Sequence, residues 1–329
     1  MTTNALVTHV IDDVQKAVFD EVLGDLAELT YLSEQADKKK RHEMLERAEV
    51  IIALSFSQKE IAADEIHSIQ NTRFIQLIYA GADNIPFDCI PENIVIASNA
   101  GAYAGPIAEH VLALALALAK NVMSNDKMLG QGKFEKSCFN QELRGGVCTI
   151  LGFGGNGKAI ATAMQALGMK IFGINRSATT DAPVDFIGDA GDLRKALGMA
   201  DVVVVTTPLN RETRDLIGQK ELEWMKADGI LINVGRGAVI NQKALYEHLK
   251  THPNFRAGID TWWSEPADRG ELALDYPFFE LPNIIGSPHC ADHVPRTMPR
   301  ATRRALENVK RFLLGKAIRG VLDRRDYCE

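Results

Sequence analysis

The middle of this chain contains a motif that indicates its fold, Ile150-Leu151-Gly152-Phe153-Gly154-Gly155-Asn156-Gly157. It runs from an apolar strand into the pattern G-x-G-x-x-G, and a helix-like stretch over residues 158–167 follows. Glycines at these places allow a tight turn, a close approach of the backbone to a pyrophosphate, and close packing of helix on strand. The phosphates would lie at the helix N-terminus. The motif indicates a nucleotide site, with an ordinary glycine-rich turn as the alternative.

The flanking sequence favours the nucleotide site. Residues 147–151 have the pattern of a buried parallel strand, and residues 170–174 that of the next strand, so the helix between them completes a βαβ unit. Four more strands are predicted at 202–206, 230–233, 255–259 and 284–285. Six strands with crossover helices match the two halves of a Rossmann doubly wound parallel sheet.

The chain before residue 99 predicts a second α/β lobe, which we expect to be flavodoxin-like. Short β-branched runs alternate with helical stretches, which is typical of a parallel sheet; the runs are 5–11, 50–55, 74–79 and 94–98, and the helical stretches reach residue 28 and cover 57–69. An amphipathic helix over 294–314 is expected to return to this lobe and make it discontinuous. The predicted domains are 1–99 with 288–329 for the substrate, and 100–287 for the dinucleotide.

A long helix rich in alanine and leucine is predicted over residues 106–128. It is apolar around much of its circumference, so it must be buried. Two interpretations stay open at this point, a core helix of one lobe and a contact between two subunits.

The length of 329 residues indicates two domains, because one domain commonly takes ~100–200 residues. The net charge of −6 leaves no basic footprint for nucleic acid, and the run Lys38-Lys39-Lys40-Arg41 suits a solvated helix face. The N-terminus lacks a signal-peptide pattern, and the longest apolar run, residues 111–119, is far below the ~20 residues of a membrane span. We therefore expect a soluble, cytoplasmic protein without nucleic-acid or membrane partners.

The cysteines are odd in number and contain no C-x-x-C pair; they are Cys89, Cys138, Cys148, Cys290 and Cys328. This pattern argues against a disulfide framework and against a structural zinc site. We expect reduced thiols and no metal.

Three later motifs follow predicted strands, at the edge where ligands of open α/β sheets bind. The first is Val234-Gly235-Arg236-Gly237. An arginine between glycines at a strand end is well placed to present a planar fork to a carboxylate, and a structural arginine is the alternative. The others are Asp260 with Glu265, and Ser287-Pro288-His289.

Glu265 and His289 end neighbouring late strands, which suits a general acid/base oriented by a carboxylate. Alone, a histidine is more often structural and a glutamate is more often a solvated side chain. Their position beside Arg236 and across from the nucleotide loop favours the functional interpretation. A Ser-His-Asp hydrolase is disfavoured, because the sequence contains no G-x-S-x-G elbow.

Over residues 74–314 the chain resembles the D-2-hydroxyacid dehydrogenase family, which includes glyoxylate and hydroxypyruvate reductases. The similar segments, in chain order, are Tyr79-Ala80-Gly81-Ala82-Asp83, Asn99-Ala100-Gly101 with Ala108-Glu109, Leu143-Arg144-Gly145, Thr207-Pro208-Leu209, Val234-Gly235-Arg236-Gly237, Asp260 with Glu265-Pro266, and Ser287-Pro288-His289. The resemblance implies an oxidoreductase that transfers a hydride between a nicotinamide cofactor and C2 of a 2-keto or 2-hydroxy acid. It also implies a homodimer.

The resemblance assigns roles to single residues. Arg236 would hold the substrate carboxylate and keto oxygen, His289 would carry the proton, and Glu265 would orient His289 and favour its protonated form. The amides of Ala80-Gly81 would hold the carboxylate as well, and Asp260 would face the nicotinamide carboxamide. The other cofactor-binding residues would be Gly152, Gly154, Gly155, Asn156, Gly157, Thr207, Pro208, Val234 and Gly235.

Some positions depart from the family pattern. After Asn99 the family commonly has Thr-Pro-Gly and Asn, whereas this chain has Ala100-Gly101-Ala102-Tyr103, so we expect Tyr103 to reach the substrate side chain. Trp262-Trp263 add bulk nearby. The run after His289 contains His293, a second candidate proton carrier.

Other functions on the same fold are weighed by single residues. Formate dehydrogenases resemble this chain but carry glutamine where Glu265 stands, and phosphite dehydrogenases place a lysine where it has Ala80. A cofactor-sensing binding protein, like the transcriptional corepressors of the superfamily, retains the Arg, Glu and His and so stays open.

The second nucleotide-binding strand predicts the cofactor. NAD-selective Rossmann domains place an acid at its end to bind the ribose 2′-hydroxyl. Here Asn175-Arg176-Ser177 follow, and the nearest acid is Asp181. These side chains can bind a 2′-phosphate, so NADP(H) is expected over NAD(H), and a permissive pocket that takes either is the alternative.

Overall fold

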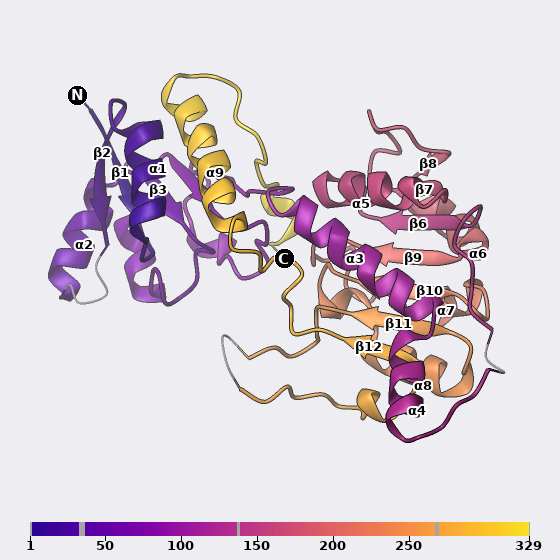
Figure 1. Cartoon of the computed structure of the whole chain (residues 1–329). Coiled ribbons are helices and arrows are strands. Elements are labelled where there is room, and N and C mark those ends of the chain that lie inside the picture. Colours follow the sequence, from indigo (N-terminus) through magenta and orange to yellow (C-terminus); the bar gives the residue numbers. More distant parts are fainter. Residues whose placement is uncertain (1, 33–36, 137–138, 267–269, 329) are drawn as a thin grey trace. The chain divides into compact units, whose positions relative to one another are not determined.

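The computed structural model describes residues 2–32, 37–136, 139–266 and 270–328. The chain forms two compact α/β units, each built on one parallel sheet (Figure 1). The first unit comprises Met1–Tyr103 with Val294–Glu329, and the second comprises Ala104–His293. The predicted fold class is confirmed. Cys138 lies outside the described residues, and the other four cysteines are free thiols.

The units divide a few residues later than the predicted boundaries at 99/100 and 287/288. Tyr103 belongs to the first unit because its hydroxyl donates to the Ile78 carbonyl at 3.0 Å. The residues around His289 belong to the second unit because its amide donates to the Asp260 carbonyl at 2.8 Å. One side-chain and one backbone hydrogen bond therefore hold the two crossings in place.

The sheet of the first unit has the order β2-β1-β3-β4-β5, which is the flavodoxin-like order. Its strands are β1 (Thr3–Val7), β2 (Ala27–Tyr31), β3 (Val50–Ala53), β4 (Phe74–Leu77) and β5 (Val95–Ala97). The helices around it are α1 (Asp13–Leu23), α2 (Lys38–Arg47) and α9 (Thr297–Leu313), with 3-10 turns η1 (Ala63–Ser68), η2 (Phe87–Cys89) and η6 (Arg324–Asp326).

Two expectations for this unit were wrong. The predicted helix over 57–69 is only the short turn η1, because the amides of Leu54, Ser55 and Ser57 donate to the Glu60 carboxylate instead. Strand β2 was not predicted, because it follows α1 closely and pairs with β1 alone at the edge of the sheet.

Helix α9 returns to the first unit, as predicted. It lies beside α1 in Figure 1, and Gln15 of α1 donates to Thr302 of α9. Arg303 makes two hydrogen bonds to Glu21, at 2.7 and 2.6 Å. The chain after α9 follows β5, where the Leu322 amide donates to the Ile96 carbonyl at 2.9 Å.

The sheet of the second unit has the order β12-β11-β10-β9-β6-β7-β8. Its strands are β6 (Val147–Leu151), β7 (Lys170–Ile174), β8 (Phe186–Gly188), β9 (Val202–Val205), β10 (Ile230–Asn233), β11 (Arg256–Ile259) and β12 (Ile284–Gly286). The six predicted strands are present, and the short edge strand β8 was missed. The helices are α5 (Gly155–Ala166), α6 (Leu193–Met199), α7 (Gln219–Trp224) and α8 (Gln242–Thr251), with turns η3 (Ala190–Asp192), η4 (Gly237–Val239) and η5 (Phe278–Glu280).

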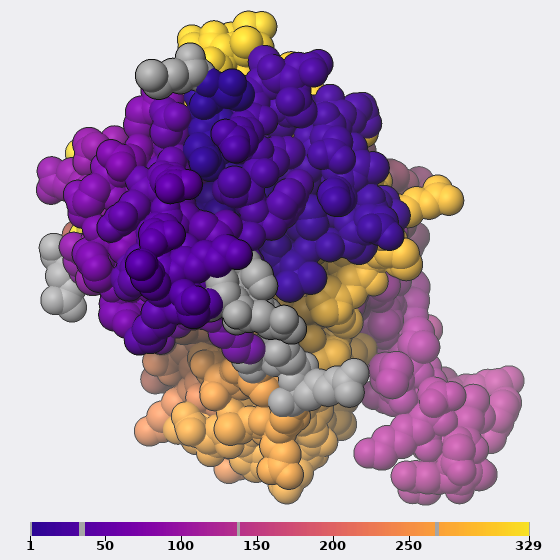
Figure 2. Space-filling view, turned by 90° about the vertical axis from the view of Figure 1, so that its left-hand side faces the viewer, coloured from indigo at the N-terminus to yellow at the C-terminus, as the bar shows by residue number. Residues whose placement is uncertain are grey.

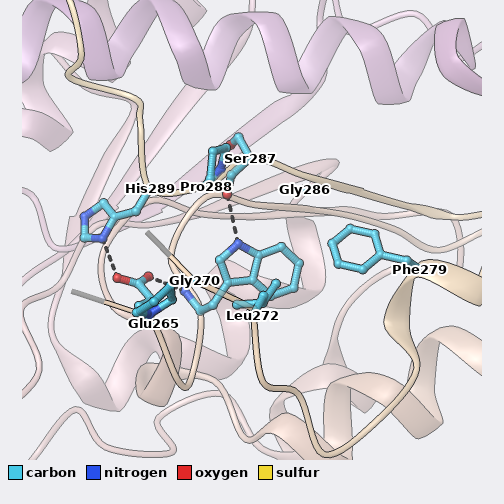
Figure 3. Close-up of a pocket in the computed structure, with 10 residues that line it drawn as sticks. Glu265, Gly270, Leu272, Phe279, Gly286, Ser287, Pro288 and His289 are labelled. Carbon is cyan, nitrogen blue, oxygen red and sulfur yellow. Dashed lines mark hydrogen bonds and ion pairs between the residues drawn. The ribbon is translucent and has the colours of Figure 1, made fainter. Parts of the chain in front are cut away.

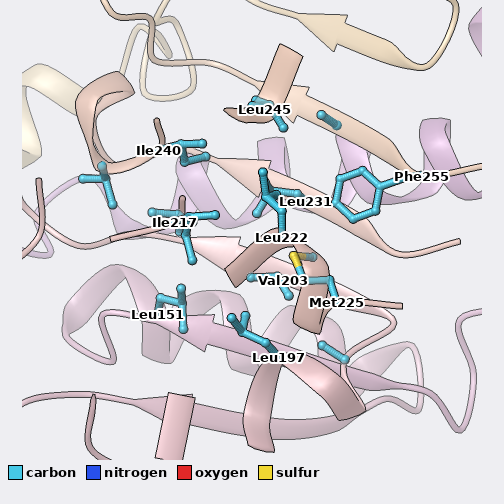
Figure 4. Packing of buried hydrophobic residues seen from close by; sticks show 14 of the residues in the cluster. Leu151, Leu197, Val203, Ile217, Leu222, Met225, Leu231, Ile240, Leu245 and Phe255 are labelled. Atoms are coloured by element: carbon cyan, nitrogen blue, oxygen red, sulfur yellow. The ribbon is translucent and has the colours of Figure 1, made fainter. Parts of the chain in front are cut away.

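Apolar side chains cover both faces of this sheet, as a parallel sheet requires. On one face Leu197, Leu222 and Leu245 of three different helices pack on strand residues such as Val203 and Leu231 (Figure 4). On the other face helices α3 and α5 pack on the strands through a second cluster. The strands are therefore fixed, and their carboxyl ends present the loops of the site.

The single helix predicted over 106–128 is two helices, α3 (Ala104–Ala119) and α4 (Val122–Gly130), bent by 58°. Asn121 adopts a left-handed φ of 51° between them, which a right-handed helix cannot continue. Helix α3 is a core helix of the second unit, whereas α4 buries none of its residues. The magenta segment around α4 stands clear of the orange body in Figure 2.

Among the described residues, no single helix is long and apolar enough to cross a membrane. Helices α3 and α4 taken together pass that test by length and composition.

Candidate active site

The glycine loop after β6 has the geometry of a dinucleotide site. Gly152 has φ +91°, and a Cβ there would lie 2.8 Å from the Thr207 amide nitrogen. A Cβ at Gly157 would lie 2.5 Å from the Gly152 carbonyl oxygen, so only glycine lets α5 pack this closely. A Cβ at Gly154 would meet nothing within 4 Å. The first and third glycines therefore shape the turn, and the second leaves space at the N-terminus of α5.

Two polar atoms beside this loop fit a bound nucleotide. The Asn156 amide oxygen and the Thr207 hydroxyl are buried and have no hydrogen-bond partner among the described residues. Buried polar atoms normally have hydrogen-bond partners, so a bound nucleotide would supply the partners that these two atoms lack. Thr207-Pro208 and Val234-Gly235 follow β9 and β10, on the same sheet edge as the glycine loop.

Asn175, Arg176 and Ser177 follow β7 on that edge. Arg176 forms an ion pair with Glu212 at 3.3 Å, and both side chains are mostly exposed. An exposed pair of this kind contributes little stability. Asp181, the nearest acid after the strand, pairs with Lys158 of α5.

Arg236 lies between β10 and η4, and its side chain is half-buried. A Cβ at Gly237 would lie 2.2 Å from the Trp262 carbonyl carbon, so the glycine is required for the loops after β10 and β11 to meet. This close approach places Arg236 beside the loop that carries Glu265. Its Nη1 donates to the Gly235 carbonyl at 2.8 Å, which fixes one edge of the guanidinium.

His289 and Glu265 form a hydrogen-bonded pair, as predicted. Figure 3 shows the His289 ring turned toward the Glu265 carboxylate, with Nδ1 at 2.7 Å from Oε2. The other oxygen, Oε1, accepts the Trp262 amide at 2.6 Å, so the carboxylate is fixed at both ends. Because Nδ1 faces Glu265, Nε2 is the nitrogen left for proton transfer.

The two groups shift each other's pKa in opposite directions. The hydrogen bond that His289 donates to Glu265 raises the pKa of His289 above its ordinary value, against burial and the charge of Arg236. Burial alone would raise the pKa of Glu265, but the hydrogen bonds from His289 and Trp262 outweigh it and lower the net value. The pair therefore favours an imidazolium beside a carboxylate.

Substitution of Glu265 by glutamine should move the pH profile of keto-acid reduction. Reduction needs the protonated imidazole, so kcat/KM should fall as pH rises through the raised pKa of His289. Without the carboxylate that pKa drops, and the fall should move to lower pH. Glu280→Gln, an exposed glutamate of the same unit, is the control. An unmoved profile in Glu265→Gln would remove Glu265 from this role.

Asp260 anchors the loop that carries His289. Its carboxylate is 1% exposed and accepts hydrogen bonds from the Ser287 hydroxyl at 2.6 Å and from the amides of Cys290 and Ala291 at 3.1 and 3.2 Å. These contacts hold the loop in place, and the expected contact of Asp260 with a nicotinamide carboxamide stays a prediction. His289 itself has a left-handed φ of 49°, a strained conformation that such contacts maintain.

His110 of α3 completes this network and was not predicted. Its Nε2 lies 2.9 Å from the Ser287 hydroxyl and 3.6 Å from the Asp260 carboxylate. Because the Ser287 hydroxyl donates its one proton to Asp260, it accepts from His110, so the His110 proton is on Nε2. A histidine on the face of an otherwise apolar helix was the available sequence signal.

A pocket of about 340 Å³ opens beside the His289–Glu265 pair. Trp262, Leu272 and Phe279 give it apolar walls. Figure 3 labels Leu272 and Phe279 among the lining residues. The Trp262 indole nitrogen donates to the Ser287 carbonyl at 2.9 Å, so the ring is fixed. Trp263 instead packs on Phe278 and donates to the Ile240 carbonyl.

Ala80, Gly81 and Tyr103 belong to the first unit. The amides of Ala80 and Gly81 follow β4 and have no acceptor among the described residues. Tyr103 is 4% exposed, with its hydroxyl bound to Ile78 and its ring against Tyr79. The ring is enclosed by these contacts, and the expected contact between Tyr103 and a substrate side chain stays a prediction.

His293 lacks the features of a proton carrier. Its side chain is 71% exposed, and its carboxylate neighbour is Asp292 at 3.8 Å. His289 therefore remains the candidate.

Known proteins are similar to this chain in both sequence and fold. Residues 112–291 match the D-isomer specific 2-hydroxyacid dehydrogenase, NAD binding domain. The chain is 30% identical over 288 residues to the hydroxypyruvate reductase of Thermotoga maritima, which covers 85% of this chain and 90% of that protein. It is 28% identical over 324 residues to the D-3-phosphoglycerate dehydrogenase of Methanocaldococcus jannaschii, covering 97% of this chain but 59% of that longer protein. A candidate formate dehydrogenase from Pyrobaculum aerophilum has a similar structure, with TM-score 0.83, 26% identity, and coverage of 99% of this chain and 100% of that one.

Proposed function

Because the chain belongs to the D-isomer specific 2-hydroxyacid dehydrogenase family, we propose that it transfers a hydride between NAD(P)H and C2 of a 2-keto or 2-hydroxy acid. The observation that carries this proposal is the His289–Glu265 pair beside Arg236, on the sheet edge that also carries the dinucleotide loop. A proton donor, a carboxylate-binding cation and a nucleotide site are the three parts that this reaction requires.

Each residue has a distinct task in this proposal. The nicotinamide cofactor supplies the hydride when bound, and its phosphates would be held by the loop Gly152–Gly157 and Thr207. Arg236 binds the substrate carboxylate and polarises the keto oxygen with its charge. His289 gives the Nε2 proton to that oxygen during reduction and takes it back during oxidation, while Glu265 stabilises the imidazolium. The unpartnered amides of Ala80 and Gly81 support their assignment to the same carboxylate.

A panel of keto acids tests this proposal. Glyoxylate, hydroxypyruvate, pyruvate and a phenyl-substituted keto acid are assayed with NADPH and with NADH. We expect turnover with at least one 2-keto acid and none with formate or phosphite, since this chain has Glu265 and Ala80 where those enzymes differ. Cofactor binding without turnover of any keto acid would instead favour a cofactor-sensing binding protein.

We further propose that NADPH is preferred over NADH. Arg176 can form charge-assisted hydrogen bonds to a 2′-phosphate, and no acid follows β7 directly to repel it. Arg176→Ala should raise the KM for NADPH about tenfold, the effect of losing one charged hydrogen bond, and leave the KM for NADH unchanged. Arg211→Ala, an exposed arginine of the loop after β9, is the control. A wild-type preference for NADH by kcat/KM would contradict the proposal.

A homodimer is also proposed, with α4 as part of its contact. Met123 and Leu129 of α4 are 55% and 59% exposed, and Phe134 and Phe139 after it are 78% and 96% exposed. Exposed apolar groups gathered on one segment are typical of a protein interface. Sedimentation equilibrium should give twice the chain mass, and a monomer mass would refute the proposal. The cytoplasmic location stays a prediction from the sequence.

A further inference from the structure

Glu60 fills the place in the first unit where open α/β sheets usually bind a ligand. In the order β2-β1-β3-β4-β5 the chain reverses direction between β1 and β3, and ligands of such sheets bind at that switch point. Thr8 follows β1 there, and Leu54 and Ser55 follow β3. The Glu60 side chain, 7% exposed, reaches into this point from the next loop.

The Glu60 carboxylate is bound there as an anionic ligand would be. Oε1 accepts the Leu54 amide at 2.7 Å and the Thr8 hydroxyl at 2.9 Å. Oε2 accepts the amides of Ser55 and Ser57, each at 3.0 Å, and their hydroxyls at 3.1 and 3.3 Å. Burial alone would raise the pKa of Glu60, but these hydrogen bonds outweigh it, so the pKa is lowered and the group is ionised.

These contacts hold the loop after β3 in a strained conformation. Phe56 has a left-handed φ of 58°, which a bulky residue adopts only when its surroundings impose it. The hydrogen bonds of Glu60 lie on both sides of Phe56, at Ser55 and Ser57. Removal of the Glu60 carboxylate would remove these contacts, and we expect the loop to leave this backbone conformation.

The same loop is bonded to the segment proposed to bind the substrate. The Leu54 amide is held by Glu60, and the Leu54 carbonyl accepts the Tyr79 amide at 2.9 Å. Ala80 and Gly81 follow directly. Two hydrogen bonds therefore connect Glu60 to Tyr79, the residue directly before Ala80 and Gly81.

We propose that Glu60 is a positioning residue that holds the amides of Ala80 and Gly81 in place for the substrate carboxylate. The inference rests on the proposed function, because it assigns those amides to a 2-keto acid. It predicts an effect on substrate binding and not on proton transfer, which belongs to His289 and Glu265.

Substitutions of Glu60 and Glu65 separate this role from simple stability. Glu65 is a buried carboxylate of the same unit, 4% exposed, with other partners than the Glu60 carboxylate. It binds the Ala62 amide and Arg41, and Arg41 also donates to the Glu60 main-chain carbonyl at 2.9 Å. Glu60→Ala should raise the KM for the keto acid about tenfold, with kcat and the KM for NADPH changed less than about threefold. Glu65→Ala should lower the unfolding temperature and leave the KM for the keto acid unchanged.

Sodium acetate supplies the missing carboxylate and gives a readout that a structural role would not move. Acetate should lower the raised KM of Glu60→Ala, whereas sodium chloride at equal ionic strength should not. If Glu60→Ala does not fold, Glu60→Gln takes its place. Glutamine keeps the shape of the side chain, but its NH₂ group would face the backbone N–H donors that the carboxylate accepts. The KM of this variant for the keto acid should rise as well. An unchanged KM in a folded Glu60 variant, or equal recovery with chloride, would overturn the proposal.

Hydrogen exchange distinguishes a failure of this inference from a failure of the proposed function. Exchange of the amides in residues 79–82 should be faster in Glu60→Gln than in wild type and unchanged in Glu65→Gln. If the wild type reduces no keto acid but this exchange increases, the positioning contact exists and the assigned substrate is wrong. If the wild type is active and the exchange does not change, Glu60 does not position the loop.

Discussion

Replacement of His289 by alanine is expected to lower kcat for keto-acid reduction at least about 100-fold, the usual contribution of a positioned general acid. The imidazole has both a raised pKa and a carboxylate partner at 2.7 Å. Because the dinucleotide loop is formed by other strands, the affinity for NADPH should be nearly unchanged. Steady-state kinetics and a fluorescence titration with NADPH measure the two quantities.

His293→Ala is the control for this substitution. Its side chain is mostly exposed and lies in the same loop region, so its loss should leave kcat nearly unchanged. Near-normal turnover in His289→Ala, with a loss in His293→Ala, would reverse the assignment of the proton donor.

Arg236→Lys is expected to raise the KM for the keto acid and lower kcat together. A guanidinium binds a carboxylate through two parallel hydrogen bonds, and an ammonium does not reproduce them. The cost in transition-state stabilisation should be on the order of ~2–5 kcal/mol, as for truncation of a buried charge pair. The ratio of kcat/KM between wild type and variant measures this cost.

Arg256→Lys provides the matched control for Arg236→Lys. Arg256 begins β11 and binds the carbonyls of Leu118 and Asp228, at the opposite end of the sheet. Its substitution should affect stability and leave KM unchanged. Equal kinetics of wild type and Arg236→Lys would show that the planar fork is not needed.

The sequence predicted the second unit well because its signals are local. The glycine loop specifies its own turn, and Arg236, Glu265 and His289 each follow a strong apolar strand, so their meeting at one sheet edge could be inferred from strand order. Edge strand β8 and the bend at Asn121 carried no such signal. Asn121 is flanked by ordinary helix-forming residues, and only the structure shows its left-handed backbone.

Long-range hydrogen bonds account for what the sequence did not predict. Glu60 binds Thr8 across 52 positions, and His110 reaches Ser287 across 177 positions. The S-x-x-E pattern of Ser57 and Glu60 is typical of the start of a helix, whereas the structure turns the Glu60 carboxylate toward the ends of β1 and β3. The burial of Tyr103 was not predicted for the same reason, since its hydroxyl partner Ile78 follows another strand, β4.

Transfer of deuterium from the cofactor shows directly whether this protein moves a hydride to C2 of a keto acid. Wild-type protein is incubated with glyoxylate or hydroxypyruvate and with NADPH or NADH that carries deuterium at C4 of the nicotinamide. Separate samples carry the deuterium on one or the other face of the nicotinamide ring. We expect a 2-hydroxy acid product with one deuterium at C2 from one labelled face only, and at most about a hundredth as much of it from His289→Ala over the same time. A protein that binds the cofactor but forms no product, or a product without deuterium at C2 from either face, would contradict the assignment of hydride transfer.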